Sequence, residues 1–141
     1  TIVTNVANKG FYEKTFINAH SIVPDKLSKM SPQPKVKVQY AGDKKIFTDG
    51  SHIIEMYKIK NTMHSNDMMV VYLPKQKVLL EADEFNTGAT PTPAPPLNPY
   101  HATFLQSIEN LGLKVDRIVP VHLPNDNRKV TMAELRAYAG K

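Results

Sequence analysis

Three side chains that could bind a metal each stand at the end of an apolar, strand-like segment of this 141-residue sequence. His64 comes just before an apolar run at 68–73, whereas Asp83 and His122 each follow such a run. Strands of one sheet can bring their ends together, and imidazole and carboxylate groups are ligands that zinc accepts. The sequence therefore predicts a metal site at a sheet edge, with zinc favoured and iron or manganese left open.

Composition narrows the class of protein. The sequence is 41% apolar, which suits one domain over 1–141 with a buried core. The net charge of +5 comes from scattered lysines and arginines, which favours a solvated surface over a nucleic-acid partner. Without cysteine there are no disulfides or thiolate ligands. No apolar run approaches the roughly 20 residues of a membrane span. We therefore expect a soluble chain with no membrane partner, and both the cytoplasm and the periplasm stay open.

The pattern of apolar residues predicts a mixture of strands and helices. Strands are expected over 2–6, 36–40, 45–48, 52–60, 68–73, 77–80 and 117–121. Helices are expected over 11–19 with Asn8 as the cap, over 100–111, and from the capping box at Thr131 to about 139. The segment 87–99 is rich in proline and is expected to be a loop. The order of elements predicts an α/β (α+β) fold, a mixed β-sheet with about three helices.

This arrangement resembles the C-terminal half of the metallo-β-lactamase superfamily, over nearly the whole chain. Residues 1–16 resemble the strand and helix that follow the first metal motif of that superfamily. Residues 63–83 are similar to its His-strand-turn-strand-Asp unit, and 118–122 to the strand that carries its last His. The resemblance implies one half of an αββα sandwich, and a half alone would expose the sheet face that normally packs against the other half.

The resemblance also assigns roles to the predicted site residues. It implies that His64 is a ligand of a first zinc, that Asp83 bridges two zincs and that His122 binds the second. The pleat places Glu81 on the same side as Asp83, so the resemblance, and not the spacing, selects Asp83. In a complete member the metal would generate a hydroxide that attacks a carbonyl or phosphoryl centre of a small-molecule substrate. Further candidates for the substrate pocket are Ser65, Asn66, Asn98 and Tyr100.

The sequence departs from the family in one important respect. The first metal motif, His-x-His-x-Asp-His, does not occur, and no two histidines have its spacing. We therefore expect a zinc-dependent, hydrolase-like chain that is truncated and inactive alone. The start at Thr1 without Met favours a longer product, with a missing N-terminal half as the partner. The alternatives are a shortened chain that forms a homo-oligomer, or a partner-binding module that keeps the fold without catalysis. His20, His52 and His101 match no motif and are expected to be structural or surface residues.

Overall fold

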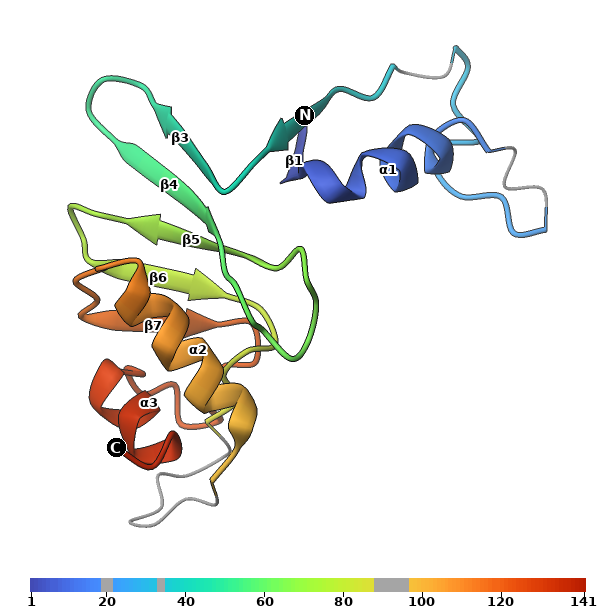
Figure 1. The fold of residues 1–141 in the computed structure, drawn as a ribbon. Coiled ribbons are helices and arrows are strands. Elements are labelled where there is room, and N and C mark those ends of the chain that lie inside the picture. The colour runs from blue at the N-terminus through green and yellow to red at the C-terminus, as the bar shows by residue number, and fades with distance from the viewer. Residues whose placement is uncertain (19–21, 33–34, 88–96) are drawn as a thin grey trace. The chain divides into compact units, whose positions relative to one another are not determined.

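The computed structural model describes residues 1–18, 22–32, 35–87 and 97–141 (Figure 1). These residues form two compact units, Thr1–Gly42 and Asp43–Lys141. In the described residues there are two sheets and three α-helices, which confirms the expected α+β fold. The single domain expected over 1–141 stays a prediction. Most of the proline-rich segment 87–99 lies outside the described residues.

The first unit contains a small parallel sheet, and its helix lies between the two strands in the chain. Strand β1 (Ile2–Asn5) pairs in parallel with β2 (Val38–Ala41). A 3-10 turn, Val6–Asn8, then leads into helix α1 (Lys9–Thr15). The helix is shorter than the predicted 11–19, and its expected C-terminal end at 19 lies outside the described residues.

The prediction that Asn8 caps this helix is confirmed for its position but not for a side-chain bond. Asn8 occupies the N-cap position, but its side chain makes no capping bond and instead donates through Nδ2 to Thr4 Oγ1 at 3.2 Å. The capping side chain is that of Asn5, whose Oδ1 accepts from the backbone N–H of Ala7 at 3.0 Å. An asparagine three residues earlier therefore starts the helical segment, because the chain first makes a 3-10 turn.

The second unit is built on a five-stranded sheet. Its strands, in spatial order, are β3 (Lys44–Thr48), β4 (Ile53–Lys58), β5 (Met69–Leu73), β6 (Val78–Glu81) and β7 (Arg117–Pro120). Neighbours are antiparallel from β3 to β6, whereas β6 and β7 are parallel. A parallel pair needs a crossover connection, and helix α2 (Pro99–Asn110) lies in this one. The predicted mixed sheet is confirmed.

Helices α2 and α3 (Met132–Tyr138) begin and end with recognisable caps. Asn98 Oδ1 accepts from the backbone N–H of Tyr100 at 2.9 Å, so α2 begins at Pro99, one residue before the predicted start. Gly112 follows α2 with φ of +65°, a left-handed conformation that glycine adopts without strain. Thr131 Oγ1 accepts from the N–H of Glu134 at 3.3 Å, which confirms the predicted start of α3.

One face of the five-stranded sheet packs against α2 and α3 and forms the core. Alternate residues of the strands bury their side chains here because successive side chains point to opposite faces. The cluster contains Val70, Tyr72, Leu79 and Ile118 from the strands, and Phe104, Leu105, Ile108, Leu135 and Tyr138 from the helices. Burying each large apolar side chain contributes about 1.5–3 kcal/mol, so this layer holds the second unit together.

The opposite face of the same sheet carries an apolar row. Met56, Val71, Leu80 and Val119 are register partners on four adjacent strands, and all four are only half-buried. Ile54 on this face is 40% exposed. In the described residues of this unit the helices pack on the other side of the sheet (Figure 1). The row is partly accessible to solvent, and that it packs against another half of a sandwich stays a prediction.

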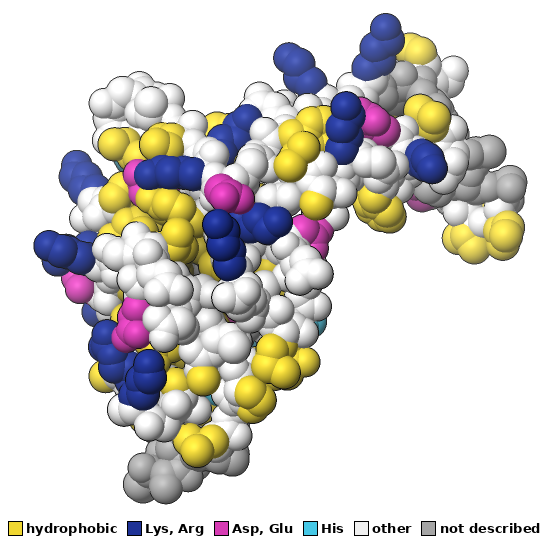
Figure 2. All heavy atoms as spheres, viewed as in Figure 1, with side chains coloured by type: hydrophobic (Ala, Val, Ile, Leu, Met, Phe, Trp, Pro, Cys, Tyr) yellow, Lys and Arg dark blue, Asp and Glu magenta, His cyan; other side chains and the backbone are white. Residues whose placement is uncertain are grey.

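The distribution of basic side chains and the length of the helices bear on possible partners. Basic side chains are spread over the visible face among polar and apolar ones (Figure 2). Across the described ranges, no helix is long and apolar enough to cross a membrane. The absence of a nucleic-acid partner stays a prediction.

Candidate metal centre

Asp83 lies between the two histidines that the sequence pairs with it. Its Oδ1 is 3.0 Å from Nε2 of His122, and its Oδ2 is 3.9 Å from Nε2 of His64. The structure therefore brings all three predicted ligands together around Asp83, with His122 Nε2 donating a hydrogen bond to Oδ1 and His64 Nε2 near Oδ2. The three side chains are 43–64% exposed, so a solute can reach them from water.

The parallel pairing of β6 and β7 places Asp83 beside His122. Glu81 and Pro120 are register partners, and Val121 N–H donates to the carbonyl of Glu81 at 3.0 Å. Asp83 and His122 each follow this pair by two residues. Asp83 adopts φ of +67°, a left-handed conformation that turns the chain sharply at the end of β6. The turn presents the carboxylate at the carboxyl ends of the two parallel strands.

His64 reaches the same point from the loop between β4 and β5. The loop is closed at its base, where Ile59 N–H donates to the carbonyl of Met68 at 3.1 Å. The backbone N–H of His64 donates to Thr62 Oγ1 at 3.0 Å. The Thr62 hydroxyl in turn donates to Glu84 Oε1. One side chain thus joins the His64 loop to the segment that follows Asp83.

Two buried carboxylates flank Asp83 in the chain. Glu81 is 6% exposed and Glu84 only 1%. Glu81 Oε2 accepts from the backbone N–H groups of Glu84 at 2.9 Å and of Phe85 at 3.3 Å. Burial raises the pKa of Glu81 to about 7, against the lowering effect of these two donors, and the charges of Glu84 and Asp83 raise it further. Glu81 therefore serves the interior of the fold, whereas Asp83 faces water.

The expectation that Glu81 and Asp83 lie on the same side fails for a simple reason. Alternation holds only within a strand, and β6 ends at Glu81. Beyond that point the left-handed turn at Asp83 sets the direction of the side chain. The sequence contains no glycine at this turn that would have signalled it.

The remaining sequence-predicted residues are not linked to the three ligands. Ser65 donates to Asp67 Oδ1, Asn66 is exposed, and the Asn98 side chain caps α2. Among the described residues no hydrogen bond joins Ser65, Asn66, Asn98 or Tyr100 to His64, Asp83 or His122. Their place in a substrate pocket stays a prediction.

The other histidines fall into different surroundings. His52 is exposed beside Asp49, with Nδ1 3.1 Å from Oδ2. His101 is buried in the core, and burial lowers its pKa. His20 lies outside the described residues.

The side chains of His64, Asp83 and His122 are of the right chemical type to bind a divalent metal, but their positions match a single site only in part. Two imidazoles and a carboxylate are ligands of zinc and of iron. Within the described ranges, however, no group of three or more His, Cys, Asp or Glu side chains is arranged to hold one ion. The two imidazoles face different oxygens of Asp83 and do not converge on one point. The bridging role of Asp83 stays a prediction.

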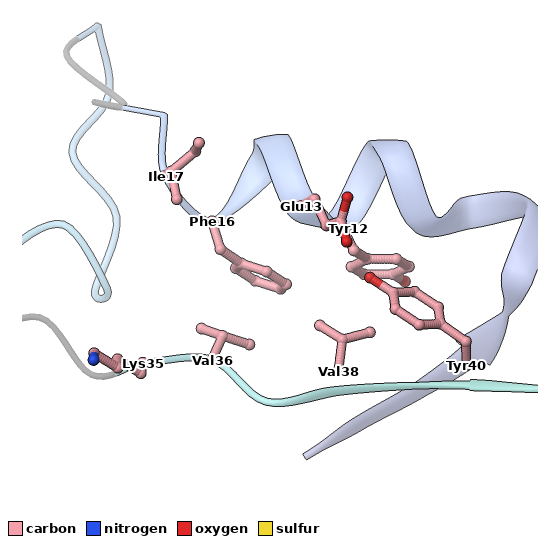
Figure 3. A pocket seen from close by; sticks show the side chains of 8 residues that line it. All are labelled: Tyr12, Glu13, Phe16, Ile17, Lys35, Val36, Val38 and Tyr40. Carbon is pink, nitrogen blue, oxygen red and sulfur yellow. The ribbon is translucent and has the colours of Figure 1, made fainter.

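The first unit contains a separate, apolar groove of about 650 Å³. Tyr12 of α1 and Phe16, which follows the helix, stack with ring centroids 5.8 Å apart and face Val36 and Val38 across it (Figure 3). Glu13 lies among these side chains. None of the three predicted metal ligands lines the groove.

Comparison with solved structures identifies the fold. A metallo-β-lactamase superfamily protein from Sulfolobus tokodaii superposes with a TM-score of 0.55 at 15% identity, over 99% of this chain and 57% of that one. A metallo-β-lactamase from Pontibacter korlensis gives 0.50 at 24% identity, over 77% and 49%. A flavo di-iron protein mutant from Thermotoga maritima gives 0.53 at 16% identity, over 98% and 35%.

This chain has part of the metallo-β-lactamase fold. Its sequence matches no protein-family model, and no curated protein matches it. At these identities the comparison shows the fold alone, and the chain spans about a third to just over half of the three structures. The predicted resemblance is thus confirmed at the level of the fold, and the roles of individual residues stay predictions.

Proposed function

We propose that this chain supplies His64, Asp83 and His122 as ligands of a zinc-dependent, hydrolase-like centre of the metallo-β-lactamase type. The observation that supports it is the approach of two imidazole Nε2 atoms to the two oxygens of one exposed carboxylate. Hydrolysis needs further ligands of the His-x-His-x-Asp-His type, which this sequence does not contain. The chain alone therefore binds metal weakly and does not turn over substrate. Iron is the alternative metal.

Each residue has a separate task in this proposal. Asp83 holds one oxygen toward each histidine because its left-handed backbone turns the carboxylate outward. His122 is held by the parallel pairing of β7 with β6, and His64 by the closed loop before β5. Zinc, when bound, would lower the pKa of a coordinated water and so supply hydroxide at neutral pH. The exposed face of the three side chains leaves room for a small-molecule substrate.

Zinc affinity of the purified chain tests the proposal directly. Zinc is titrated against a competing chromophoric chelator for the wild type and for His64→Ala, Asp83→Asn and His122→Ala. Asp83→Asn is expected to weaken binding most, because both histidines share that carboxylate. The control is His52→Ala, which removes an exposed histidine that also pairs with a carboxylate, at 3.1 Å.

Two results would count against the proposal. A wild-type chain with no more affinity for zinc than Asp83→Asn would show that these residues are not ligands. Zinc-dependent hydrolysis by the purified chain, abolished by His64→Ala, would show that it is active without the first motif. An assay with lactam, thioester and phosphodiester substrates covers the second case.

A second candidate function is self-association without catalysis, and the apolar row on the open sheet face favours it. Met56, Val71, Leu80 and Val119 form a continuous half-buried strip of the kind that sheets pack together in sandwiches. The proposed occupant is the same strip of a second copy of this chain. Such packing would give the two-layered sheet arrangement of a complete sandwich.

Sedimentation over a concentration series tests this second candidate. We expect the wild type to be a dimer. Ile54 lies on the same sheet face as the strip, so Ile54→Lys should make the chain monomeric. Ile22→Lys, at a side chain 95% exposed in the first unit, is the matched control and should leave the dimer intact. A wild-type monomer at micromolar concentration would refute self-association.

A further inference from the structure

A hydrogen bond between the partly buried Thr62 and the buried Glu84 connects the two loops that carry His64 and Asp83. The hydroxyl of Thr62 donates to Glu84 Oε1, and its oxygen accepts from the backbone N–H of His64 at 3.0 Å. Glu84 is 1% exposed, whereas His64 and Asp83 are largely exposed. The contact that relates the two exposed ligands is therefore made from inside the fold.

The backbone of Glu84 is fixed as well. Its N–H donates to Glu81 Oε2 at 2.9 Å, and the next N–H, of Phe85, donates to the same oxygen at 3.3 Å. Phe85 is itself buried and packs edge-on against Tyr138, with ring centroids 5.5 Å apart. The segment after Asp83 is thus anchored through two consecutive residues, Glu84 and Phe85.

We propose that Thr62 and Glu84 are positioning residues that set the His64 imidazole against the Asp83 carboxylate. This inference rests on the proposed function, because the Thr62–Glu84 hydrogen bond has this role only if His64 and Asp83 bind metal. Thr62 is suited to the task because its one hydroxyl donates to a carboxylate and accepts from a backbone N–H at the same time. Glu84 provides a carboxylate acceptor that is only 1% exposed, and burial strengthens such a hydrogen bond.

The chemistry of the pair explains an otherwise costly feature. A carboxylate that is 1% exposed needs partners, and burial without them is strongly unfavourable. In the described residues Glu84 Oε1 has the Thr62 hydroxyl, and Oε2 has no hydrogen-bond partner. A buried carboxylate with one hydrogen-bond partner lowers the free energy of unfolding. Its position is better explained by its hydrogen bond to the loop that carries His64.

The first measurement uses the metal-free protein, with chelator present. Amide hydrogen exchange at His64 is followed by NMR in the wild type, Thr62→Val, Thr62→Ala and Thr62→Ser. Loss of the hydroxyl in Val or Ala is expected to speed exchange at His64 about fivefold, the effect of one lost hydrogen bond. Ser keeps the hydroxyl and should exchange as the wild type does. Glu84→Gln keeps an acceptor oxygen and should also preserve the His64 amide.

The matched control is Val130→Ala, a core residue 1% exposed that destabilises the fold away from the loop. Exchange at His64 that is unchanged in both Thr62→Val and Thr62→Ala, or equally fast in Val130→Ala, would overturn the proposal. Val130→Ala also shows how much of any change comes from general loss of stability.

Zinc affinity is the second measurement, and it separates this inference from the proposed function. Loss of the Thr62 hydroxyl is expected to weaken zinc binding about 10–100-fold, as for other residues that orient a ligand, with Ser near wild type. A wild-type chain that binds no zinc would overturn the metal-binding function. Amide exchange at His64 would still report on the hydrogen bond from Thr62 to Glu84. Zinc binding in Thr62→Val at wild-type affinity would overturn the positioning role alone.

Discussion

The buried histidine of α2 should make the fold sensitive to acid. His101 is 6% exposed and packs edge-on against Phe85 and Tyr138, with ring centroids 5.1 and 5.5 Å away. Its Nδ1 is buried and has no hydrogen-bond partner among the described residues. Burial therefore lowers the pKa of His101 below its ordinary value of 6.5.

The sign of the effect follows from proton linkage. Because the unfolded chain binds a proton at higher pH than the folded chain does, the free energy of unfolding falls as pH drops through 6.5. The loss is at most about 1.4 kcal/mol for each pH unit over which only the unfolded histidine is protonated. Glu81 acts in the opposite direction: its pKa is raised from 4.5 to about 7, so its contribution to stability grows as pH falls through that window. The wild-type profile therefore shows only the difference between the two.

The variant His101→Phe isolates the histidine. Phenylalanine keeps an aromatic ring between Phe85 and Tyr138, and any change in packing energy is the same at every pH. Urea unfolding followed by circular dichroism from pH 5 to 8, with chelator, should give wild-type and variant curves that diverge below pH 6.5. Ile108→Val, on the same helix and 1% exposed, is the control and should run parallel to the wild type. Parallel curves for His101→Phe as well would refute the reasoning.

Three smaller predictions concern the scaffold. Phe104→Ala, at a fully buried core position, should lower the free energy of unfolding by about 3–5 kcal/mol in urea titration. Thr131→Ala removes the cap of α3 and should cost about 0.5–2 kcal/mol by the same titration. Gly112→Ala has open space around the new methyl group but keeps φ at +65°, so calorimetry should show a loss of about 1–2 kcal/mol that is due to the backbone alone.

Apolar runs and the helical spacing of apolar residues are enough to predict most of the second unit. The strands around 68–73 and 117–121 and the helix over 100–111 are found within about two residues of their expected ends, a normal disagreement for element boundaries. Thr131 was found because a capping box is a local signal of four residues. Such features need no knowledge of the rest of the chain.

Features that depend on distant contacts were missed. The side chain of Asn8 donates to Thr4 in the preceding strand β1. Asn8 therefore stands at the N-cap position without bonding the helix through its side chain. The tie from Thr62 to Glu84 spans 22 residues and has no sequence pattern. A glutamate beside an aspartate looks like a second surface acid, and only the fold shows that it is buried.

The candidate centre combines both kinds of information. Spacing and residue type singled out His64, Asp83 and His122, but the pairing of Glu81 with Pro120 is what places two of them side by side. A parallel pair presents the carboxyl ends of both strands at one edge, and the left-handed turn at Asp83 then brings its carboxylate to His122. His64 has no such geometric guarantee, because it lies in a loop and 3.9 Å from Asp83. It is therefore the candidate ligand whose position most needs an internal support, and the loop it occupies is the one that Thr62 attaches to Glu84.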